Sequence, residues 1–544
     1  VSTAADGNGP AGVLRVYGSG GWRFYQGTGP TFTSPAGDNG TLTLQGGTYT
    51  YSTPDGQAVT FNSAGYQTSW TSADGQQTLL YRYDGSNHLS GLTASDGALT
   101  TIAYASGLAQ TIQTVNGRTT TLGYTANGAV SDLTQITNPD GGVHTFAFDA
   151  NSRVTGETFG GLQDEWAYTS AGTLGTMTWG STTFNGVSNP STTTLTPAVL
   201  QGLSALAAGT VWAVTTDPTG HTTRSQLDPS GRPLQILAPD GGLTQYTRDG
   251  NGYVTRESDP LNRVTTYTRD AQGYVTQATL PDGNTQLYAY QSAFHVLTTY
   301  TDERGYSTTY AYDPANGHLL SETDARGKTT RYGWTANGLP QSVTDPLNHT
   351  TTNGYDSFRR LQQTQDALGQ LTTYTFDNNG NPLTVKDALG RVTTTNYDVM
   401  GRLTSVVDAL GGIATSTYDA AGLLLTSTDP LGHQTSTVYD PYRRGLPVTA
   451  LEAVGTTAQA SSLTSFDAAG RATGARNPDG WWSNTAFDPV GRPVQSTDAL
   501  GNVSRTVFDL AGEVTATRDA LGNWTQEKYN LRGWATQTVD ALGN

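Results

Sequence analysis

The feature of this sequence that most constrains its fold is a period of 21 residues. One row of acidic residues keeps this spacing, each opening a turn-like run: Asp345, Asp366, Asp387, Asp408 and Asp429. A row of aromatic residues, each followed by Asp, keeps the same spacing: Tyr355, Phe376, Tyr397, Tyr418 and Tyr439. A fixed period of this length indicates one structural unit that is copied along a line.

Each repeat reads as two short β-prone runs separated by two turns. The tetrad Asp429-Pro430-Leu431-Gly432 matches a β-turn, with Asp hydrogen-bonding the backbone, Pro presetting φ and Gly at the fourth place. The other turn, Tyr418-Asp419-Ala420-Ala421-Gly422, again places Gly three residues after Asp, where the backbone needs a positive φ. We therefore predict one β-hairpin per repeat.

Alternation along the second run of each repeat places Thr393, Thr395 and Tyr397 on one face of a strand. A single hairpin is marginal alone, so stability should come from neighbouring copies that pair edge to edge and stack their aromatic residues. A twisted ribbon of about thirty strands cannot stay flat. The predicted fold class is therefore all-β: a repetitive β-hairpin array, with about 21 residues per repeat, coiled into a spiral or hollow shell.

The composition agrees with a folded β protein and narrows the function. Only 14% of the 544 residues are charged, and 28 Tyr stand beside 13 Phe, which disfavours a disordered chain. The net charge of −16 disfavours a nucleic-acid-binding or anionic membrane surface, because such surfaces need clustered Lys and Arg. There is no run of 18 apolar residues, and there are no Cys, so we expect neither membrane insertion nor disulfides.

The quality of the repeat changes along the chain. Residues 1–184 carry degenerate repeats, and we expect an atypical capping sheet around Gly18–Tyr25. Residues 185–216 form an irregular insertion, in which Thr196–Gly209 has the cap, Pro and terminal Gly of a short helix. Residues 217–544 hold the regular repeats, with a longer loop at 450–464. Because the chain starts without Met and stops within a repeat, we expect it to be a piece of a longer protein.

The residues that could carry chemistry mostly fall on repeat positions. Turn Asp residues are read as turn formers; calcium between stacked turns is the weaker alternative, because the Gly-Gly-x-Gly-x-Asp nonapeptide is absent. Three His follow a turn tetrad directly, at a place also taken by Arg391 and Asn502, which indicates a solvated position: His221, His349 and His433. Neither a Ser/His/Asp set nor a Gly-x-x-x-x-Gly-Lys loop can be assembled. We predict no catalytic, cofactor-binding or metal-binding residues, and no enzyme activity.

Two further groups have a functional and a plainer interpretation. Trp481-Trp482 and Trp524 could form an aromatic platform for sugar, but packing within the array is favoured. Gly401-Arg402 and Gly491-Arg492 could belong to a basic stripe, but surface ion pairs of little energy with the Asp rows are favoured.

An aromatic-Asp pair followed by Gly-Arg is the signature of the repeat, as in Tyr397-Asp398-Val399-Met400-Gly401-Arg402. Phe466–Arg471 and Phe487–Arg492 repeat it. This signature resembles the YD repeat of the Rhs family, strongly across 217–544 and more weakly before. The resemblance implies a hollow β-shell of coiled hairpins, as in bacterial Rhs effectors, insecticidal toxin complexes and teneurins. In the toxins such shells enclose a C-terminal toxic segment, and in teneurins they serve cell-surface adhesion.

Rhs proteins that process themselves share an Asp-Pro-x-Gly-Leu-x-Asp-Gly type motif, which does not occur here. The nearest fragment, Gly91–Gly97, lacks the upstream Asp-Pro, so no self-cleavage residue is assigned. Our leading hypothesis is a non-catalytic shell segment of a large bacterial protein, exported or at the cell surface, that encases or carries a polypeptide toxin. The alternative is an adhesion module that binds glycans or a partner protein. The cargo, the receptor, the delivery system and the oligomeric state stay open.

Overall fold

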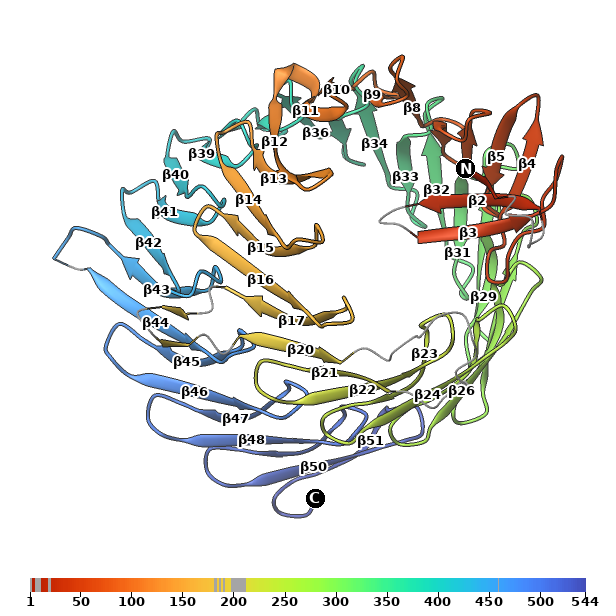
Figure 1. Ribbon diagram of the computed structural model, residues 1–544. Coiled ribbons are helices and arrows are strands. Elements are labelled where there is room, and N and C mark those ends of the chain that lie inside the picture. Colours follow the sequence, from red (N-terminus) through yellow and green to blue (C-terminus); the bar gives the residue numbers. More distant parts are fainter. Residues whose placement is uncertain are drawn as a thin grey trace. The chain divides into compact units, whose positions relative to one another are not determined.

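The structure is a computed structural model, and it describes residues 2–4, 11–17, 21–180, 183–184, 187–188, 191–196, 212–457 and 459–544. It divides into two compact units. Unit 1 contains residues 1–119, 248–255 and 265–394, and unit 2 contains residues 120–247, 256–264 and 395–544. The described part consists of β-strands joined by tight turns, with one 3₁₀ turn at Val115–Gly117 (Figure 1).

The strands are short, and most contain five or six residues. The first eleven are β1 Ser2–Ala4, β2 Gly12–Tyr17, β3 Gly21–Gln26, β4 Thr41–Gln45, β5 Thr48–Ser52, β6 Ala58–Phe61, β7 Gln67–Thr71, β8 Thr78–Tyr83, β9 Leu89–Ala94, β10 Leu99–Ala105 and β11 Leu108–Gln113. They are followed by β12 Thr119–Asn127, β13 Val130–Thr137, β14 Val143–Phe148, β15 Val154–Phe159, β16 Leu162–Tyr168, β17 Leu174–Trp179, β18 Thr183–Phe184, β19 Val187–Ser188, β20 Thr192–Thr196, β21 Trp212–Thr216, β22 Thr222–Leu227, β23 Pro233–Leu237, β24 Leu243–Arg248 and β25 Val254–Ser258.

The regular repeats supply the remaining strands. Up to residue 397 these are β26 Val264–Arg269, β27 Val275–Thr279, β28 Thr285–Tyr290, β29 Leu297–Thr301, β30 Ser307–Tyr312, β31 Leu319–Thr323, β32 Thr329–Trp334, β33 Pro340–Thr344, β34 Thr350–Tyr355, β35 Leu361–Gln365, β36 Leu371–Phe376, β37 Pro382–Lys386 and β38 Val392–Tyr397. The last are β39 Leu403–Val407, β40 Ile413–Tyr418, β41 Leu424–Thr428, β42 Gln434–Tyr439, β43 Pro447–Glu452, β44 Ala460–Phe466, β45 Ala472–Arg476, β46 Trp482–Phe487, β47 Pro493–Thr497, β48 Val503–Phe508, β49 Val514–Arg518, β50 Trp524–Tyr529 and β51 Ala535–Val539.

Strand pairing is antiparallel and follows the chain order, except that β17 pairs with β20 while β18 and β19 form a two-stranded sheet of their own. In unit 2, for example, β41 pairs with β40 on one side and with β42 on the other. Figure 1 shows β46, β47 and β48 side by side in the same way. The strands β1, β2 and β3 form a separate three-stranded sheet. Each 21-residue repeat is thus the hairpin that its two turns predict.

A β-bulge recurs beside the aromatic-Asp turns, as between β40 and β41, β42 and β43, and β48 and β49. In β40 and β41, Thr417 pairs with Thr426, but the next residue, Tyr418, pairs with Leu424, so that Leu425 is passed over. The extra residue bends the strand and increases its twist. The aromatic strand itself keeps its alternation, because Ala414, Ser416 and Tyr418 are half-buried whereas the residues between them are exposed. The predicted common face of Thr393, Thr395 and Tyr397 is half-buried as well.

Deep burial is concentrated near the N-terminus. Seven buried side chains form one hydrophobic cluster in unit 1: Val13, Tyr25, Phe32, Leu42, Tyr49, Tyr51 and Phe61. Elsewhere among the described residues, Leu122 and Ala278 are the buried hydrophobic residues. The repeats are therefore held by strand pairing and half-buried side chains on the sheet faces, whereas β2 and β3 pack on a core with β4 to β6.

The irregular insertion is described in part. Thr192–Thr196 and Trp212–Thr216 are the strands β20 and β21, which pair with each other. Apart from Thr196, the helix expected within 196–209 lies outside the described residues, and the boundaries of the three predicted segments stay a prediction. The longer loop predicted at 450–464 overlaps the end of β43, Pro447–Glu452, and the start of β44, Ala460–Phe466. Within the described ranges, no helix is long and apolar enough to cross a membrane.

Candidate functional site

The carboxylate oxygens of the turn Asp residues accept hydrogen bonds from backbone N–H groups. Oδ1 of Asp408 accepts hydrogen bonds from the N–H groups of Leu410 and Gly412, both at 2.8 Å. The N–H of Gly411 donates to the carbonyl of Asp408 at 3.0 Å, and Gly411 has the positive φ of 86° that the turn needs. The turn-forming role predicted for these carboxylates is therefore what the geometry shows.

The residue four positions after a turn Asp has a defined task. Arg391 Nε donates to Asp387 Oδ2 at 2.6 Å, and Asn502 Nδ2 donates to Asp498 Oδ2 at 2.8 Å. His433 and His349 place Nδ1 2.8 and 2.9 Å from the corresponding carboxylates, whereas His221 Nδ1 lies 3.7 Å from Asp217. His349 and His433 are solvated, as predicted, with side chains 61% and 62% exposed, whereas His221 is less solvated than predicted, at 34%. The sequence did not predict that the side chain four residues after a turn Asp binds the second carboxylate oxygen of that Asp.

The aromatic-Asp turn adds a link between consecutive repeats. Arg402 Nε donates to Asp398 Oδ2 at 2.6 Å within its own turn. The same guanidinium donates to the backbone carbonyl of Asp419 at 3.2 Å and lies 5.4 Å from the centroid of the Tyr418 ring. Arg360 and Arg492 make the equivalent contacts: each pairs with the Asp of its own turn, and each contacts the backbone carbonyl and the aromatic ring of the next repeat's aromatic-Asp pair. The ion pairs predicted for the Gly-Arg positions exist.

The predicted surface exposure of these ion pairs was wrong, whereas their predicted low energy stays a prediction. They were expected to be surface pairs of little energy, but the Arg402 and Asp398 side chains are only 25% and 22% exposed. The Arg444–Asp440 pair is buried more deeply, at 9% and 1%. The reason is the neighbouring aromatic ring, which covers the guanidinium and shields the pair from water.

The electrostatics of these carboxylates favour the charged form. Burial alone would raise the pKa of Asp398, but hydrogen bonds from the Arg402 N–H, the Arg402 guanidinium and the Met400 N–H hold that pKa below its ordinary value. Asp356 and Asp488 have lowered pKa values for the same balance of causes. A general acid needs a pKa near the working pH, so this shift suits a structural carboxylate.

Turns of early repeats also meet turns of much later repeats within the same unit. In unit 2, Arg402 Nη2 lies 3.1 Å from Asp140, and Arg492 Nη2 lies 2.9 Å from Asp240. In unit 1, His318 Nε2 lies 2.8 Å from Asp74. The third residue of the early turn therefore contacts a basic residue of the later one.

The tryptophans proposed for sugar stacking lie on partly exposed positions. Trp481 follows a turn and is 59% exposed, while Trp482 and Trp524 open β46 and β50 and are 42% and 39% exposed. Across the described ranges, no group of three or more His, Asp or Glu side chains is arranged to hold a metal ion.

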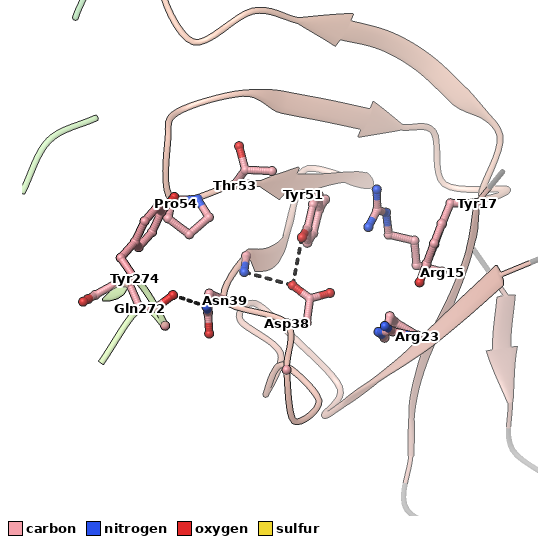
Figure 2. Close-up of a pocket in the computed structure, with 13 residues that line it drawn as sticks. Arg15, Tyr17, Arg23, Asp38, Asn39, Tyr51, Thr53, Pro54, Gln272 and Tyr274 are labelled. Atoms are coloured by element: carbon pink, nitrogen blue, oxygen red, sulfur yellow. Dashed lines mark hydrogen bonds between the residues drawn. The ribbon is translucent and has the colours of Figure 1, made fainter. Parts of the chain in front are cut away.

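A pocket of about 510 Å³ in unit 1 brings together residues that the sequence pattern did not connect. Figure 2 shows Arg15, Arg23 and Tyr17 on one side, and Asn39, Gln272 and Tyr274 on the other, with Asp38 and Tyr51 between them. The first side comes from the β2–β3 sheet. The second comes from the loop at 37–40 and from a turn at 272–274.

Strand register explains why two arginines face this pocket. β2 and β3 pair Val13 with Tyr25, Arg15 with Arg23, and Tyr17 with Gly21. Val13 and Tyr25 are 1% and 0% exposed, so this face of the sheet begins in the hydrophobic cluster. Two residues further along each strand the same face carries both guanidinium groups.

Asp38 is already satisfied by its neighbours in the pocket wall. It accepts hydrogen bonds from the Tyr51 hydroxyl at 2.8 Å, from the Gly40 N–H at 2.9 Å and from the Tyr25 hydroxyl. Burial, followed by the hydrogen bond to Asp38, raises the pKa of Tyr51 to about 12, and the same causes raise the pKa of Tyr25. Both hydroxyls therefore stay protonated and hold the carboxylate in place.

Sequence reasoning had no means of finding this pocket as a site. It expected a capping sheet at Gly18–Tyr25 and assigned no ligand-binding residue there. The available signal was the gathering of Arg15, Tyr17 and Arg23 in a chain that has 29 basic against 45 acidic residues. The partners from 37–40 and 272–274 are too distant in sequence to be joined to them by a pattern.

Comparisons with known proteins agree with the geometry of the repeats. Four stretches match the family described as RHS Repeat, at residues 248–285, 314–350, 355–391 and 376–413. The crystal structure of TcdB2-TccC3 superposes with a TM-score of 0.61 at 13% identity, covering 96% of this chain and 35% of that chain. The structure of the Photorhabdus luminescens Tc holotoxin pore with mutation TccC3-D651A gives a TM-score of 0.46 at 12% identity, covering 96% of this chain and 32% of the other.

No curated protein matches the sequence significantly. This chain spans about a third of the length of the solved TcdB2-TccC3 chain, so what that whole protein does is not transferred with the fold. The predicted resemblance and the predicted fold class are confirmed: the structure is an all-β, long array of antiparallel hairpins.

Proposed function

Because this chain carries RHS repeats on a TcdB2-TccC3-like shell fold, we propose that it is a non-catalytic shell segment that encases or carries a polypeptide cargo. In this proposal it belongs to a larger exported bacterial protein, and its cargo is a toxin or another polypeptide segment. The repeats supply the wall, and the cargo is a separate part of the assembly.

The distribution of buried side chains carries this proposal. A packed enzyme domain of this length would bury many hydrophobic residues in its own cores. Here, outside the N-terminal cluster, Leu122 and Ala278 are the buried hydrophobic residues of the described ranges. A sheet with so little core is suited to be a wall, because both of its faces stay available to contact something else.

The turn network supports the same role. The aromatic-Asp turns that carry Arg360, Arg402 and Arg492 tie one repeat to the next, and the pairs Arg402–Asp140 and Arg492–Asp240 tie distant repeats of unit 2. Such closely spaced cross-links suit a rigid wall, since neighbouring repeats cannot slide past each other without breaking charged hydrogen bonds.

Adhesion remains the second candidate, because Trp481, Trp482 and Trp524 present partly exposed rings. Aromatic rings with one wet edge are common where proteins bind sugars or partner proteins. Binding of glycans or cells that is lost in a Trp481→Ala, Trp482→Ala double variant would favour this candidate.

Protection of a guest polypeptide tests the shell proposal. An unstructured reporter that carries a protease site is fused after Asn544, and its cleavage rate is compared with that of the same reporter fused to an unrelated folded protein. The shell proposal expects slower cleavage in the first fusion, and protection that is lost when the array is unfolded by denaturant. Equal cleavage rates in both fusions would contradict it.

A further inference from the structure

The pocket beside the β2–β3 sheet contains a like-charge pair that needs a partner. Arg15 and Arg23 are direct cross-strand neighbours. Like charges at such positions destabilise a sheet, because their Cβ atoms lie only about 5 Å apart. Across the described residues, no carboxylate lies within ion-pair distance of either guanidinium. An anion placed between the two groups would remove the repulsion.

The immediate surroundings hold the Arg15 guanidinium but leave donors for a ligand. Its central carbon lies 3.8 Å from the centroid of the Tyr51 ring and 5.2 Å from that of Tyr17. Its Nε is buried and has no hydrogen-bond acceptor among the described atoms. Asp38 is the carboxylate that lines the pocket, and its oxygens already accept hydrogen bonds from the Tyr25 and Tyr51 hydroxyls and the Gly40 N–H.

Arg23 is the freer of the two basic residues. Its Nη1 donates to the neighbouring Trp22 carbonyl at 3.0 Å, and its guanidinium lies 5.8 Å from the Tyr17 ring centroid. The side chain is exposed. A guanidinium has five N–H donors, so most of its hydrogen-bonding capacity is open to the pocket.

The opposite side of the pocket is uncharged, polar and aromatic. Asn39 Nδ2 donates to the Tyr253 hydroxyl at 2.6 Å and to the Gln272 carbonyl, which fixes the amide in place. Thr53, Pro54 and Tyr274 complete this side. Amide and hydroxyl groups next to a ring suit a ligand that combines hydroxyls with an apolar face, and the volume lies within the range of small-ligand pockets.

We propose that this pocket binds a sugar acid, whose carboxylate lies between Arg15 and Arg23 and whose hydroxylated ring faces Asn39 and Tyr274. Two guanidinium groups can hold one carboxylate with paired, charge-assisted hydrogen bonds. The ligand is a free sugar acid or the acidic end residue of a glycan, since both present the same group. This site goes beyond the wall function proposed above and does not depend on it.

The test compares two sugars that differ at one carbon. The full chain is titrated with D-glucuronate and with D-glucose, and binding is followed by saturation-transfer NMR and calorimetry. We expect saturable binding of glucuronate that is at least about tenfold tighter than that of glucose, and that weakens as salt rises. Glucuronate that binds no more tightly than glucose would overturn the proposal.

Sodium acetate and sodium sulfate form a second arm of the experiment. If the sugar ring contributes, acetate and sulfate compete with glucuronate only at concentrations about tenfold higher. If the affinity of acetate equals that of glucuronate, the pocket takes simple oxyanions and the sugar-acid assignment is wrong. Glycans that end in glucuronate then separate the two sources: a glycan that binds as tightly as the free acid shows that the pocket admits a chain end.

Variants separate the site from general charge effects. Arg23→Gln removes an exposed guanidinium and should weaken glucuronate binding about tenfold without lowering the melting temperature, because it also relieves the repulsion with Arg15. Arg15→Gln should weaken binding at least as much, although its contact with Tyr51 means that its melting temperature must be measured too. Arg326→Gln is the matched control, because Arg326 is an exposed turn residue of the same unit. Equal binding by Arg23→Gln and Arg326→Gln would overturn the proposal.

Discussion

The hydroxyl of Tyr418 donates a hydrogen bond of 2.9 Å to the backbone carbonyl of Leu403, 15 residues earlier in the chain. The same bond joins Tyr439 to Leu424 at 2.9 Å and Tyr529 to Val514 at 2.7 Å. Trp334 makes it with its indole N–H, at 2.8 Å from the carbonyl of Leu319. Where this aromatic residue is Tyr or Trp, it therefore both packs on the sheet and is hydrogen-bonded to the preceding hairpin.

Tyr418→Phe should reduce the free energy of unfolding by about 1 kcal/mol, because it removes the hydroxyl and keeps the ring. The fold should persist, since Phe376, Phe487 and Phe508 occupy the same place in other repeats. Denaturant unfolding followed by circular dichroism measures the change. Tyr306→Phe is the control, because its ring is 59% exposed and should give no loss. An equal effect of both substitutions would contradict a stabilising role of this hydrogen bond.

Arg402→Ala should destabilise the chain by about 2 kcal/mol, because it removes the contacts with Asp398, Asp419, Asp140 and the Tyr418 ring together. Arg391→Ala removes an ion pair of the same sequence spacing whose Arg is 64% exposed, and its effect should stay below about 0.5 kcal/mol. Thermal and urea unfolding of both variants test the comparison. The interpretation fails if the two losses are similar.

The parts of the fold that depend on neighbouring residues could be predicted from the sequence. The turn at Asp408 and the positive φ of Gly411 follow from Asp and Gly at a fixed spacing, and the hairpin follows from the turns. The bulge that skips Leu425 could not be predicted, because a period counts residues without showing which strand carries the extra one. The shielding of Arg402 was missed for a related reason: its ring partner belongs to the next repeat.

Features that depend on distant residues were beyond any sequence pattern. Arg402 meets Asp140, which lies 262 residues earlier, and the offset depends on how the strands twist and stack. The pocket has the same origin, since Arg15 and Arg23 become neighbours by register but meet Asn39 and Gln272 only in the folded chain. The prediction of no ligand-binding residues was argued from the regular repeats, and the N-terminal sheet does not follow their pattern.

Acidification should reduce the stability of the repeat array more than other moderate changes of pH. The pKa of Asp387 lies below its ordinary value, chiefly because the Arg391 N–H donates a hydrogen bond to it. Burial opposes this shift, and a hydrogen bond from the Arg391 side chain adds to it. Asp356, Asp398 and Asp488 also have lowered pKa values. A carboxyl whose pKa is lower in the folded state stabilises the fold above its unfolded pKa, near 3.9, and this contribution disappears as the pH falls through the folded pKa.

The melting temperature should therefore change little between pH 7 and pH 5, and should fall steeply between about pH 4 and about pH 2. Circular dichroism melts at constant ionic strength measure this dependence. Variants that replace Asp398 and Asp488 with Asn should be less stable at pH 7 and should lose less on acidification. A midpoint that stays constant down to about pH 2.5, or that falls mainly between pH 7 and pH 5, would contradict the role assigned to the turn carboxylates.

The difference between wall and cap can be measured with two leucines. Leu410 occupies the tip of a repeat turn and is 95% exposed, whereas Leu42 is fully buried in the N-terminal cluster. Leu410→Ser should change the free energy of unfolding by less than about 0.5 kcal/mol, because the side chain contributes almost no buried area. Leu42→Ala should cost about 3 kcal/mol, since it leaves a cavity among Tyr25, Phe32 and Tyr51.

Calorimetric and denaturant unfolding of both leucine variants provide the measurement, and Leu431→Ser, at 81% exposure, is a second wall position. A substantial loss in Leu410→Ser would show that the exposed turn leucines are covered in solution, and would contradict a wall whose turn tips are free. A negligible loss in Leu42→Ala would instead show that the N-terminal cluster does not hold β2 and β3 in place. In that case the register that sets Arg15 opposite Arg23 would lack the support of a packed core.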